Sequence, residues 1–247
     1  MIITVINQKG GTGKTTTTVN VGAALAKSKQ NVMLVDFDPQ GNLSYSLGVN
    51  DFEFGVRDVL SSSVGWADIL EEREGMYIAP SDQRLSALKF GTKDPEFTLR
   101  KSLEVAHDFD YVLIDCPPSL SLLTINALAA ADRVLIPIQL DVFSIQGLVQ
   151  ILDTVNEVKM TSNPELEILG VLPVLVDNRK SLTREIKQHV IDNFDVHVFK
   201  NEVRTNVKAA EAPSFGKSVV SYSPSSNSAQ DYLKVSKEIK KLIKVKA

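Results

Sequence analysis

The sequence predicts an α/β protein with a mostly parallel, twisted sheet that is flanked by helices on both faces. Short apolar runs alternate with helix-length amphipathic segments along the 247 residues, as expected where crossover helices join parallel strands. A glycine-rich segment directly follows the first apolar run. The length and the 43% share of hydrophobic residues fit one compact domain spanning residues 1–247.

Seven short apolar runs are expected to form strands. Two of them end in an aspartate, Asp36 and Asp115. The predicted strands are residues 2–7, 32–36, 76–79, 110–115, 133–138, 168–174 and 196–199.

Six amphipathic segments are expected to form helices. The stretch from Asn50 to Ser63 mixes Gly and Ser with short apolar groups, and we expect it to be irregular. No linker, repeat or low-complexity tract divides the sequence. The predicted helices are residues 15–28, 98–107, 120–131, 144–159, 181–193 and 228–244.

The glycine-rich segment predicts a loop that binds phosphates. Its glycines allow successive backbone N–H groups to converge on an anion, and the helix that follows presents its N-terminus to the same anion. Lys14 is expected to neutralise the terminal phosphates, the Thr15 hydroxyl to bind Mg²⁺, and Thr16 to add a hydroxyl contact. The segment consists of Lys9, Gly10, Gly11, Thr12, Gly13, Lys14, Thr15 and Thr16.

The loop departs from the usual pattern G-x-x-x-x-G-K-[ST]. Gln8 stands where the first glycine is expected, and a second lysine, Lys9, follows it. The string from Asn7 to Thr16 resembles the deviant Walker A motif of the ParA/Soj family of DNA-partitioning ATPases, which are P-loop NTPases. The resemblance implies that residues 8–16 bind ATP and that Lys9 reaches across a two-fold interface to the nucleotide of a partner subunit. ATP would then hold a homodimer together.

Two acidic motifs agree with this resemblance. Asp38 lies in a string that matches the family's Asp-x-Asp-Pro-Gln-Gly-Asn, which implies that Asp38 orients the attacking water; it is also a candidate metal ligand. Asp36 is expected to be structural, since an acid at a strand end often caps the next turn, but the reverse assignment stays open. Asp115 matches the Walker B position and is expected to hold Mg²⁺ through water, with residues 116–119 as the adjoining switch segment.

These residues predict slow, partner-stimulated ATP hydrolysis. Phosphoryl transfer depends mainly on positioning and charge stabilisation, and the predicted catalytic residues Lys9, Lys14 and Asp38 supply both. Nothing in the sequence resembles a strong nucleophile or a general-base histidine. The three histidines show no metal-ligand spacing and are expected to be surface or packing residues: His107, His189 and His197.

Charge is unevenly distributed along the chain. Within a net charge of −3, residues 1–160 carry −7 and residues 161–247 carry +4. Basic side chains of the second part are candidates for binding DNA phosphates without reading bases. A solvated polar face is the alternative, because no recognised reading helix or aromatic stacking set accompanies them. The candidates are Arg179, Lys180, Arg184, Lys187, Lys200, Arg204, Lys208 and Lys217.

Two further strings resemble the family. Residues 203–217 are similar to a segment that usually begins with Pro-Arg and has Arg in place of Lys208. In relatives this segment contributes to the adenine pocket and to the DNA-facing surface, which implies that Pro213 lines the base. The family's Asp-x-Arg-x-x-Leu element is also matched, without the Thr and Tyr that commonly precede it, by Asp177, Arg179 and Leu182.

Three other functions would leave different marks in the sequence. A MinD-like membrane-associated ATPase would have Gly at position 8 and end in a lipid-binding helix. We expect the C-terminal apolar stripe instead to pack on the core, because it lacks bulky interfacial aromatics. A nucleotide-regulated scaffold without DNA binding also stays open. An iron–sulfur relative would need two cysteines, and the chain has Cys116 alone, an expected packing residue. The stripe consists of Tyr232, Val235, Ile239, Leu242 and Ile243.

The combined prediction is a dimeric switch that depends on ATP and Mg²⁺. In its ATP state it binds double-stranded DNA nonspecifically, and a ParB-like centromere-binding partner triggers hydrolysis, so that chromosome or plasmid DNA is segregated or positioned. No apolar run approaches the ~18 residues of a membrane span, and the sequence enters the first strand without a leader or an additional DNA-reading domain. We therefore expect a cytoplasmic, nucleoid-associated protein without site-specific repressor activity.

Overall fold

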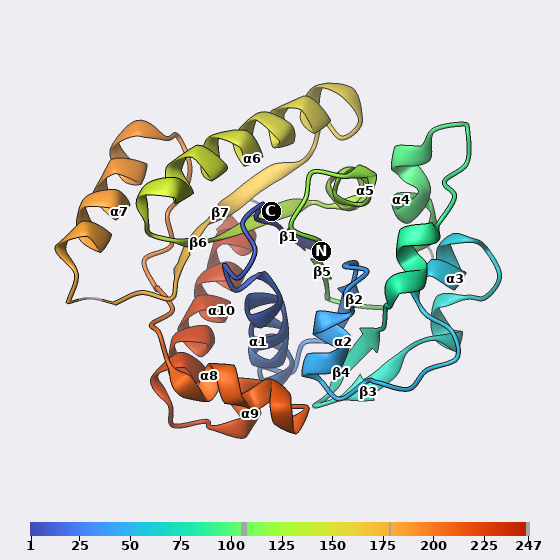
Figure 1. The fold of residues 1–247 in the computed structure, drawn as a ribbon, viewed down its shortest axis with the longest axis horizontal. Helices are drawn as coiled ribbons and strands as arrows, with labels where there is room; N and C mark the ends of the chain where they lie inside the picture. The colour runs from blue at the N-terminus through green and yellow to red at the C-terminus, as the bar shows by residue number, and fades with distance from the viewer. Residues whose placement is uncertain (105–107, 178, 246–247) are drawn as a thin grey trace.

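The computed structural model describes residues 1–104, 108–177 and 179–245. Within them, seven strands form one sheet with helices on both faces (Figure 1), which confirms the predicted fold class. The strand order is β3-β4-β2-β5-β1-β6-β7. Each neighbouring pair is parallel except β3 with β4.

Six strands match predicted apolar runs, with ends that differ by at most two residues. They are β1 (Ile2–Val5), β2 (Val32–Asp36), β4 (Met76–Ala79), β5 (Tyr111–Asp115), β6 (Arg133–Gln139) and β7 (Glu167–Val174).

The seventh predicted strand, residues 196–199, is wrong. This segment forms a single parallel bridge, between Val171 and Val198. The pairing stops because the backbone N–H groups of Lys200 and Asn201 both turn to the carboxylate of Glu238.

The seventh observed strand, β3 (Glu71–Arg73), was not predicted because its three residues are charged. It forms an antiparallel hairpin with β4. The two turn residues, Glu74 and Gly75, both have positive φ, as a tight hairpin requires. The Glu74-Gly75 pair was therefore the feature of the sequence that could have predicted this hairpin.

The six predicted helices are all present. α4 stops at Leu103, and the predicted positions 105–107 lie outside the described residues. The observed helices are α1 (Lys14–Lys27), α4 (Thr98–Leu103), α5 (Leu122–Ala130), α6 (Val142–Thr161), α7 (Ser181–Asn193) and α10 (Asn227–Val245).

Short helices were missed, because one turn is too short to show a periodic pattern. One of them, α3, lies inside the stretch of residues 50–63 that was expected to be irregular. They are α2 (Asn42–Ser46), α3 (Val56–Leu60), α8 (Val207–Glu211) and α9 (Val219–Tyr222).

The sheet separates two apolar layers. Along β5, Val112 and Ile114 face the layer that contains α3 to α7, whereas Leu113 faces the layer of α1, α2, α9 and α10 (Figure 1). This alternation follows from the two-residue period of a strand. Both faces of the central strands are therefore covered, which explains their nearly continuous apolar sequences.

The C-terminal stripe is used in this packing, as expected. Tyr232, Val235 and Ile239 are at most 2% exposed, and Leu242 and Ile243 pack against the same cluster beside α1. In the part of the chain that the structure describes, no helix has both the length and the apolarity to cross a membrane.

The topology places the functional motifs at one edge of the sheet. β1 lies between β5 and β6, so the strand order reverses at β1. In open sheets of this kind, ligands bind outside the carboxyl ends of the strands where the order reverses. The glycine-rich loop follows β1 there. Asp36 and Asp115 are register partners at the ends of β2 and β5.

Gly170 provides a test of the packing beside β7. It has φ of +154°, and an added Cβ would lie 2.7 Å from the backbone oxygen of His197. We expect Gly170→Ala to lower the free energy of unfolding by about 2–4 kcal/mol, measured by urea denaturation. Gly147 in α6 has open space around it, so Gly147→Ala should instead raise stability by about 0.5–1 kcal/mol. Equal effects of the two variants would contradict the described backbone at Gly170.

Candidate functional site

The glycine-rich loop has the backbone that anion binding requires. Gly11 and Gly13 both have φ of 74°, a left-handed conformation that side chains oppose. Gly13 is also the N-cap of α1, and no side chain caps this helix. The N–H groups of the first helical turn are therefore available to a ligand.

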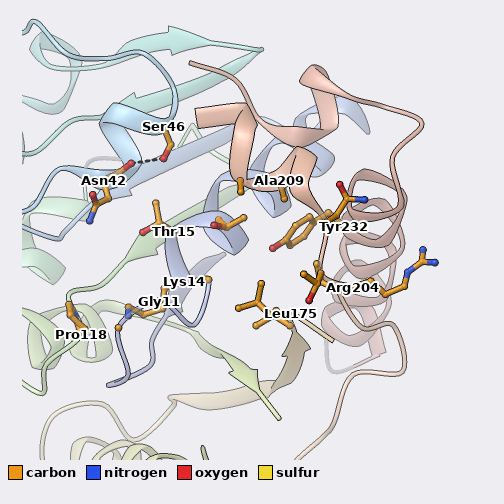
Figure 2. A pocket seen from close by; sticks show the side chains of 18 of the residues that line it. Gly11, Lys14, Thr15, Asn42, Ser46, Pro118, Leu175, Arg204, Ala209 and Tyr232 are labelled. Atoms are coloured by element: carbon orange, nitrogen blue, oxygen red, sulfur yellow. Dashed lines mark hydrogen bonds between the residues drawn. The ribbon is translucent and has the colours of Figure 1, made fainter. Parts of the chain in front are cut away.

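A cavity of about 630 Å³ opens beside this loop, a size typical of small-molecule sites. Figure 2 shows its two ends. Gly11, Lys14 and Thr15 lie at the polar end, whereas Leu175, Ala209 and Tyr232 line the opposite, more apolar end. The cavity thus joins a phosphate-binding surface to an apolar pocket that can accept a flat base.

A hydroxyl and a buried carboxylate meet at the polar end. Thr15 Oγ1 donates to Asp115 Oδ2 at 2.6 Å, and Thr18 Oγ1 donates to Asp115 Oδ1 at 3.2 Å. Oxygen donors of this kind suit Mg²⁺, which keeps several of its waters. The residues present therefore fit the predicted metal. Thr18 was not predicted, although it lies one helical turn after Thr15 on the same face of α1.

Asp36 and Asp38 have different environments. Asp36 is fully buried, and its Oδ2 accepts hydrogen bonds from Ser44 N at 2.8 Å and Ser44 Oγ at 2.7 Å. Ser44 Oγ in turn accepts from Ser81 N. Asp36 therefore anchors the start of α2. Asp38 instead lines the cavity, with Oδ1 accepting from Gln40 N. This arrangement favours Asp38 for orienting water and Asp36 for structure.

The buried acids sit in an unusual electrostatic environment. Burial, together with the Asp115 carboxylate, raises the pKa of Asp36 to about 8. Burial also raises the pKa of Asp115 to about 7, against the hydrogen bonds from its threonines and the charge of Lys14. Burial lowers the pKa of Lys14, although Asp115 and Asp38 oppose this shift. Lys14 lines the cavity and Asp115 contacts the cavity residue Thr15; perturbed groups placed in this way are typical of functional sites.

Some predicted nucleotide-binding residues lie outside this cavity. Thr12 is buried, and its hydroxyl donates to the backbone oxygen of Lys9. Gln8 lines a separate groove beside α6. The Lys9 side chain turns to the start of α6, where its Nζ lies 2.5 Å from Asp141 Oδ2. Lys9 is therefore not directed at the phosphate site of its own subunit.

The expectation for Pro213 is not supported by the cavity. Pro213 lies in the 3₁₀ helix Ala212–Phe215, whose Ala212 is buried in the core, and it is not among the lining residues. Contact of Pro213 with a base therefore stays a prediction, while other residues of the same string, such as Val207 and Ala209, line the cavity. The apolar end is formed by Val174 and Leu175, by Tyr232 of the C-terminal stripe, and by four residues of the string that resembles the family's adenine-pocket segment: Val203, Val207, Ala209 and Ala210.

Several predicted DNA-binding side chains are already paired with carboxylates. Arg204 donates twice to Asp231, with a shortest distance of 2.7 Å, and Figure 2 shows its guanidinium pointing away from the cavity. The remaining pairs are Arg179 with Asp177, Lys187 with Glu202 and Lys208 with Glu211.

The other candidates carry free charges. Lys180, Arg184 and Lys217 are exposed and form no ion pair with any described residue. Lys187, Lys200 and Arg204 line one groove together with Lys234, which was not among the candidates. Lys217 lies two residues before α9, which is at the bottom of the view, whereas α7 is at its left (Figure 1). The basic residues therefore do not all share one surface.

His189, His197 and Cys116 do not line the cavity. His189 is exposed on α7, His197 contacts Glu238 at 3.2 Å, and His107 lies outside the described residues. Cys116 is buried in the core, as expected for a packing residue. No group of three or more His, Cys, Asp or Glu side chains in residues 1–104, 108–177 and 179–245 could hold a metal ion by itself.

Comparisons with known proteins agree with this geometry. A family profile described as an AAA domain matches residues 1–168. Among solved structures, cobyrinic acid a,c-diamide synthase from Mycobacterium smegmatis with bound ADP and magnesium aligns with a TM-score of 0.87 at 33% identity, covering 100% of this chain and 96% of that one.

Curated relatives match over nearly the whole length. The sporulation initiation inhibitor protein Soj of Bacillus subtilis is 42% identical over 246 residues, covering 96% of this chain and 97% of Soj. The chromosome partitioning protein ParA of Caulobacter vibrioides is 39% identical over 248 residues, covering 96% and 93%. With the deviant phosphate loop and its Thr15–Asp115 contact, these matches show that the chain belongs to the ParA/Soj family of DNA-partitioning ATPases.

Proposed function

We propose that residues 1–247 act as one ATPase unit that dimerises when it binds ATP and Mg²⁺ and that partitions chromosome or plasmid DNA. The observation that carries this proposal is the position of the two loop lysines. Lys14 lines the phosphate end of the cavity, whereas Lys9 lies outside it on the surface. The relatives named for chromosome partitioning, and the neighbour solved with ADP and magnesium, support it.

Each residue has a defined task in hydrolysis. The N–H groups at the start of α1 and Lys14 would hold the phosphates, Thr15 and, through water, Asp115 would hold Mg²⁺, and Asp38 would orient the attacking water. The bound metal supplies neutralisation of phosphate charge. No histidine among the described residues lines the cavity to act as a general base. Without such a base we expect slow hydrolysis. A ParB-like partner that stimulates it belongs to the proposed partitioning function.

The ATP-bound dimer binds DNA through its free basic side chains. Lys180 directly precedes α7, and Arg184 lies in the first turn of this helix. Both side chains are exposed and form no ion pair with a described carboxylate. Such lysines and arginines contact phosphates without reading bases. The protein is accordingly cytoplasmic and nucleoid-associated. The competing function is a nucleotide-regulated scaffold that does not bind DNA. The DNA-binding experiment below distinguishes the two functions.

The role of Lys9 is tested by Lys9→Ala. Because Lys9 does not face its own cavity, this variant should bind ATP within about threefold of the unmodified affinity and yet remain monomeric in sedimentation experiments with Mg²⁺-ATP. Lys14→Ala should weaken ATP binding by about tenfold to a hundredfold. A Lys9→Ala variant that still dimerises would remove the proposed role in the partner subunit.

The role of Asp38 is tested against Asp36. Asp38→Asn should reduce the rate of ATP hydrolysis by about 100-fold while ATP-bound dimers accumulate. Asp36→Asn should chiefly lower the thermal midpoint, since Asp36 anchors Ser44. Single-turnover hydrolysis and thermal unfolding, measured on both variants, decide which aspartate orients the water. The reverse pattern would assign this role to Asp36.

DNA binding is tested by Lys180→Ala combined with Arg184→Ala. The double variant should bind unrelated duplex DNA more weakly in fluorescence anisotropy with ATP, and its log–log salt slope should fall by about 0.9 per lost phosphate contact. Lys208→Ala should have less effect, because Lys208 is paired with Glu211. Lys101→Ala, an exposed residue on the distant α4 (Figure 1), is the control. No binding by the unmodified protein at low salt would favour the scaffold.

A further inference from the structure

The ion pair between Lys9 and Asp141 joins two segments that are 132 positions apart in the chain. Lys9 belongs to the phosphate loop, and Asp141 lies between β6 and α6. The side chains are 44% and 29% exposed. The pair is thus accessible to water, and Lys9 can leave it without disturbing the core.

Both ends of this pair are held in place. The backbone N–H of Lys9 donates to Asn7 Oδ1 at 2.9 Å, and Asn7 Nδ2 donates to the backbone oxygen of Pro137 at 2.7 Å. Asp141 is the N-cap of α6, and its Oδ1 accepts from Ser144 N at 3.0 Å. Capping by Oδ1 leaves Oδ2 free for Lys9. The carboxylate is therefore fixed on a rigid helix end within reach of the lysine.

The surface around the pair is apolar and uncovered. Val142 and Phe143, which directly follow Asp141, are 62% and 79% exposed. Leu120, which shares a groove with Gln8 and α6, is 39% exposed. Large exposed apolar groups of this kind mark interaction surfaces when they gather. Lys9 is therefore held by its own subunit on a face where a second subunit would have apolar side chains to cover.

We propose that Asp141 is a latch that keeps Lys9 within its own subunit and thereby raises the protein concentration at which the ATP-bound dimer forms. This inference rests on the proposed role of Lys9 in the partner's site. Before Lys9 reaches the phosphates of another subunit, it must give up the carboxylate of Asp141. A triphosphate outcompetes a single carboxylate for the ammonium group because it carries more charge, so release is coupled to nucleotide.

The latch predicts that Asp141→Asn strengthens dimerisation. Asparagine is an equally good N-cap, so the contact with Ser144 N is retained while the charge facing Lys9 is lost. An exposed ion pair opposes release by about threefold per subunit, and two pairs open per dimer. We therefore expect the dimer dissociation constant to fall about tenfold, measured by sedimentation velocity with Mg²⁺ and the slowly hydrolysed analogue ATPγS.

Glu157→Gln is the matched control. Glu157 is exposed on the same helix and removing its charge changes the net charge equally, but it does not contact Lys9. This variant should dimerise like the unmodified protein. An equal gain in both variants would show a general charge effect and would overturn the latch.

A second measurement needs no dimer. In nucleotide-free protein, acetic anhydride labelling followed by mass spectrometry should modify Lys9 several-fold faster in Asp141→Asn than in the unmodified chain, with Lys180 as the internal reference. The latch alone is overturned if the labelling of Lys9 is unchanged in the variant. It is also overturned if the unmodified protein dimerises and the variant dimerises equally well or more weakly. An unmodified protein that stays monomeric with ATPγS refutes the dimer proposal and the latch together, even where labelling confirms the ion pair.

Discussion

The contact of Asp115 with Thr15 and Thr18 is the interaction on which the site depends. It joins the end of β5 to the first turn of α1 through distances of 2.6 and 3.2 Å, so the phosphate loop and the acid at the end of β5 have one fixed geometry. The carboxylate is fully buried beside Asp36. Burying two acids side by side opposes ionisation and costs stability, an arrangement that is useful where a cation is to be bound.

The two lysines of the loop lie in different environments. Lys14 begins α1, is 7% exposed and lines the cavity. Lys9 lies five positions earlier, on the other side of the loop, and is held by an acid from α6. Lys14 faces the cavity. Lys9 lies on the exterior, with its ammonium group in an internal ion pair.

The basic C-terminal part shows a different limit. Its excess of positive charge is real, but Arg204 and Lys208 are paired with Asp231 and Glu211. Arg204 in particular stabilises the contact between the cavity wall and α10, because both of its donating groups bind one buried carboxylate. Charges counted along a sequence thus overstate the positive surface that is free to meet a polyanion.

The sequence by itself determined the fold class, six of the strands, the six longer helices, and the strand-loop-helix that binds phosphate, because these depend on local periodicity and on residues adjacent in the chain. Only the tertiary structure decided that Val174, Leu175 and Tyr232 join Val203, Val207, Ala209 and Ala210 at the apolar end of the cavity, and that Asp141 holds Lys9. Those contacts join segments that are far apart in sequence. Which residues meet in these contacts depends on how the helices pack on the sheet, and local sequence patterns do not predict that packing.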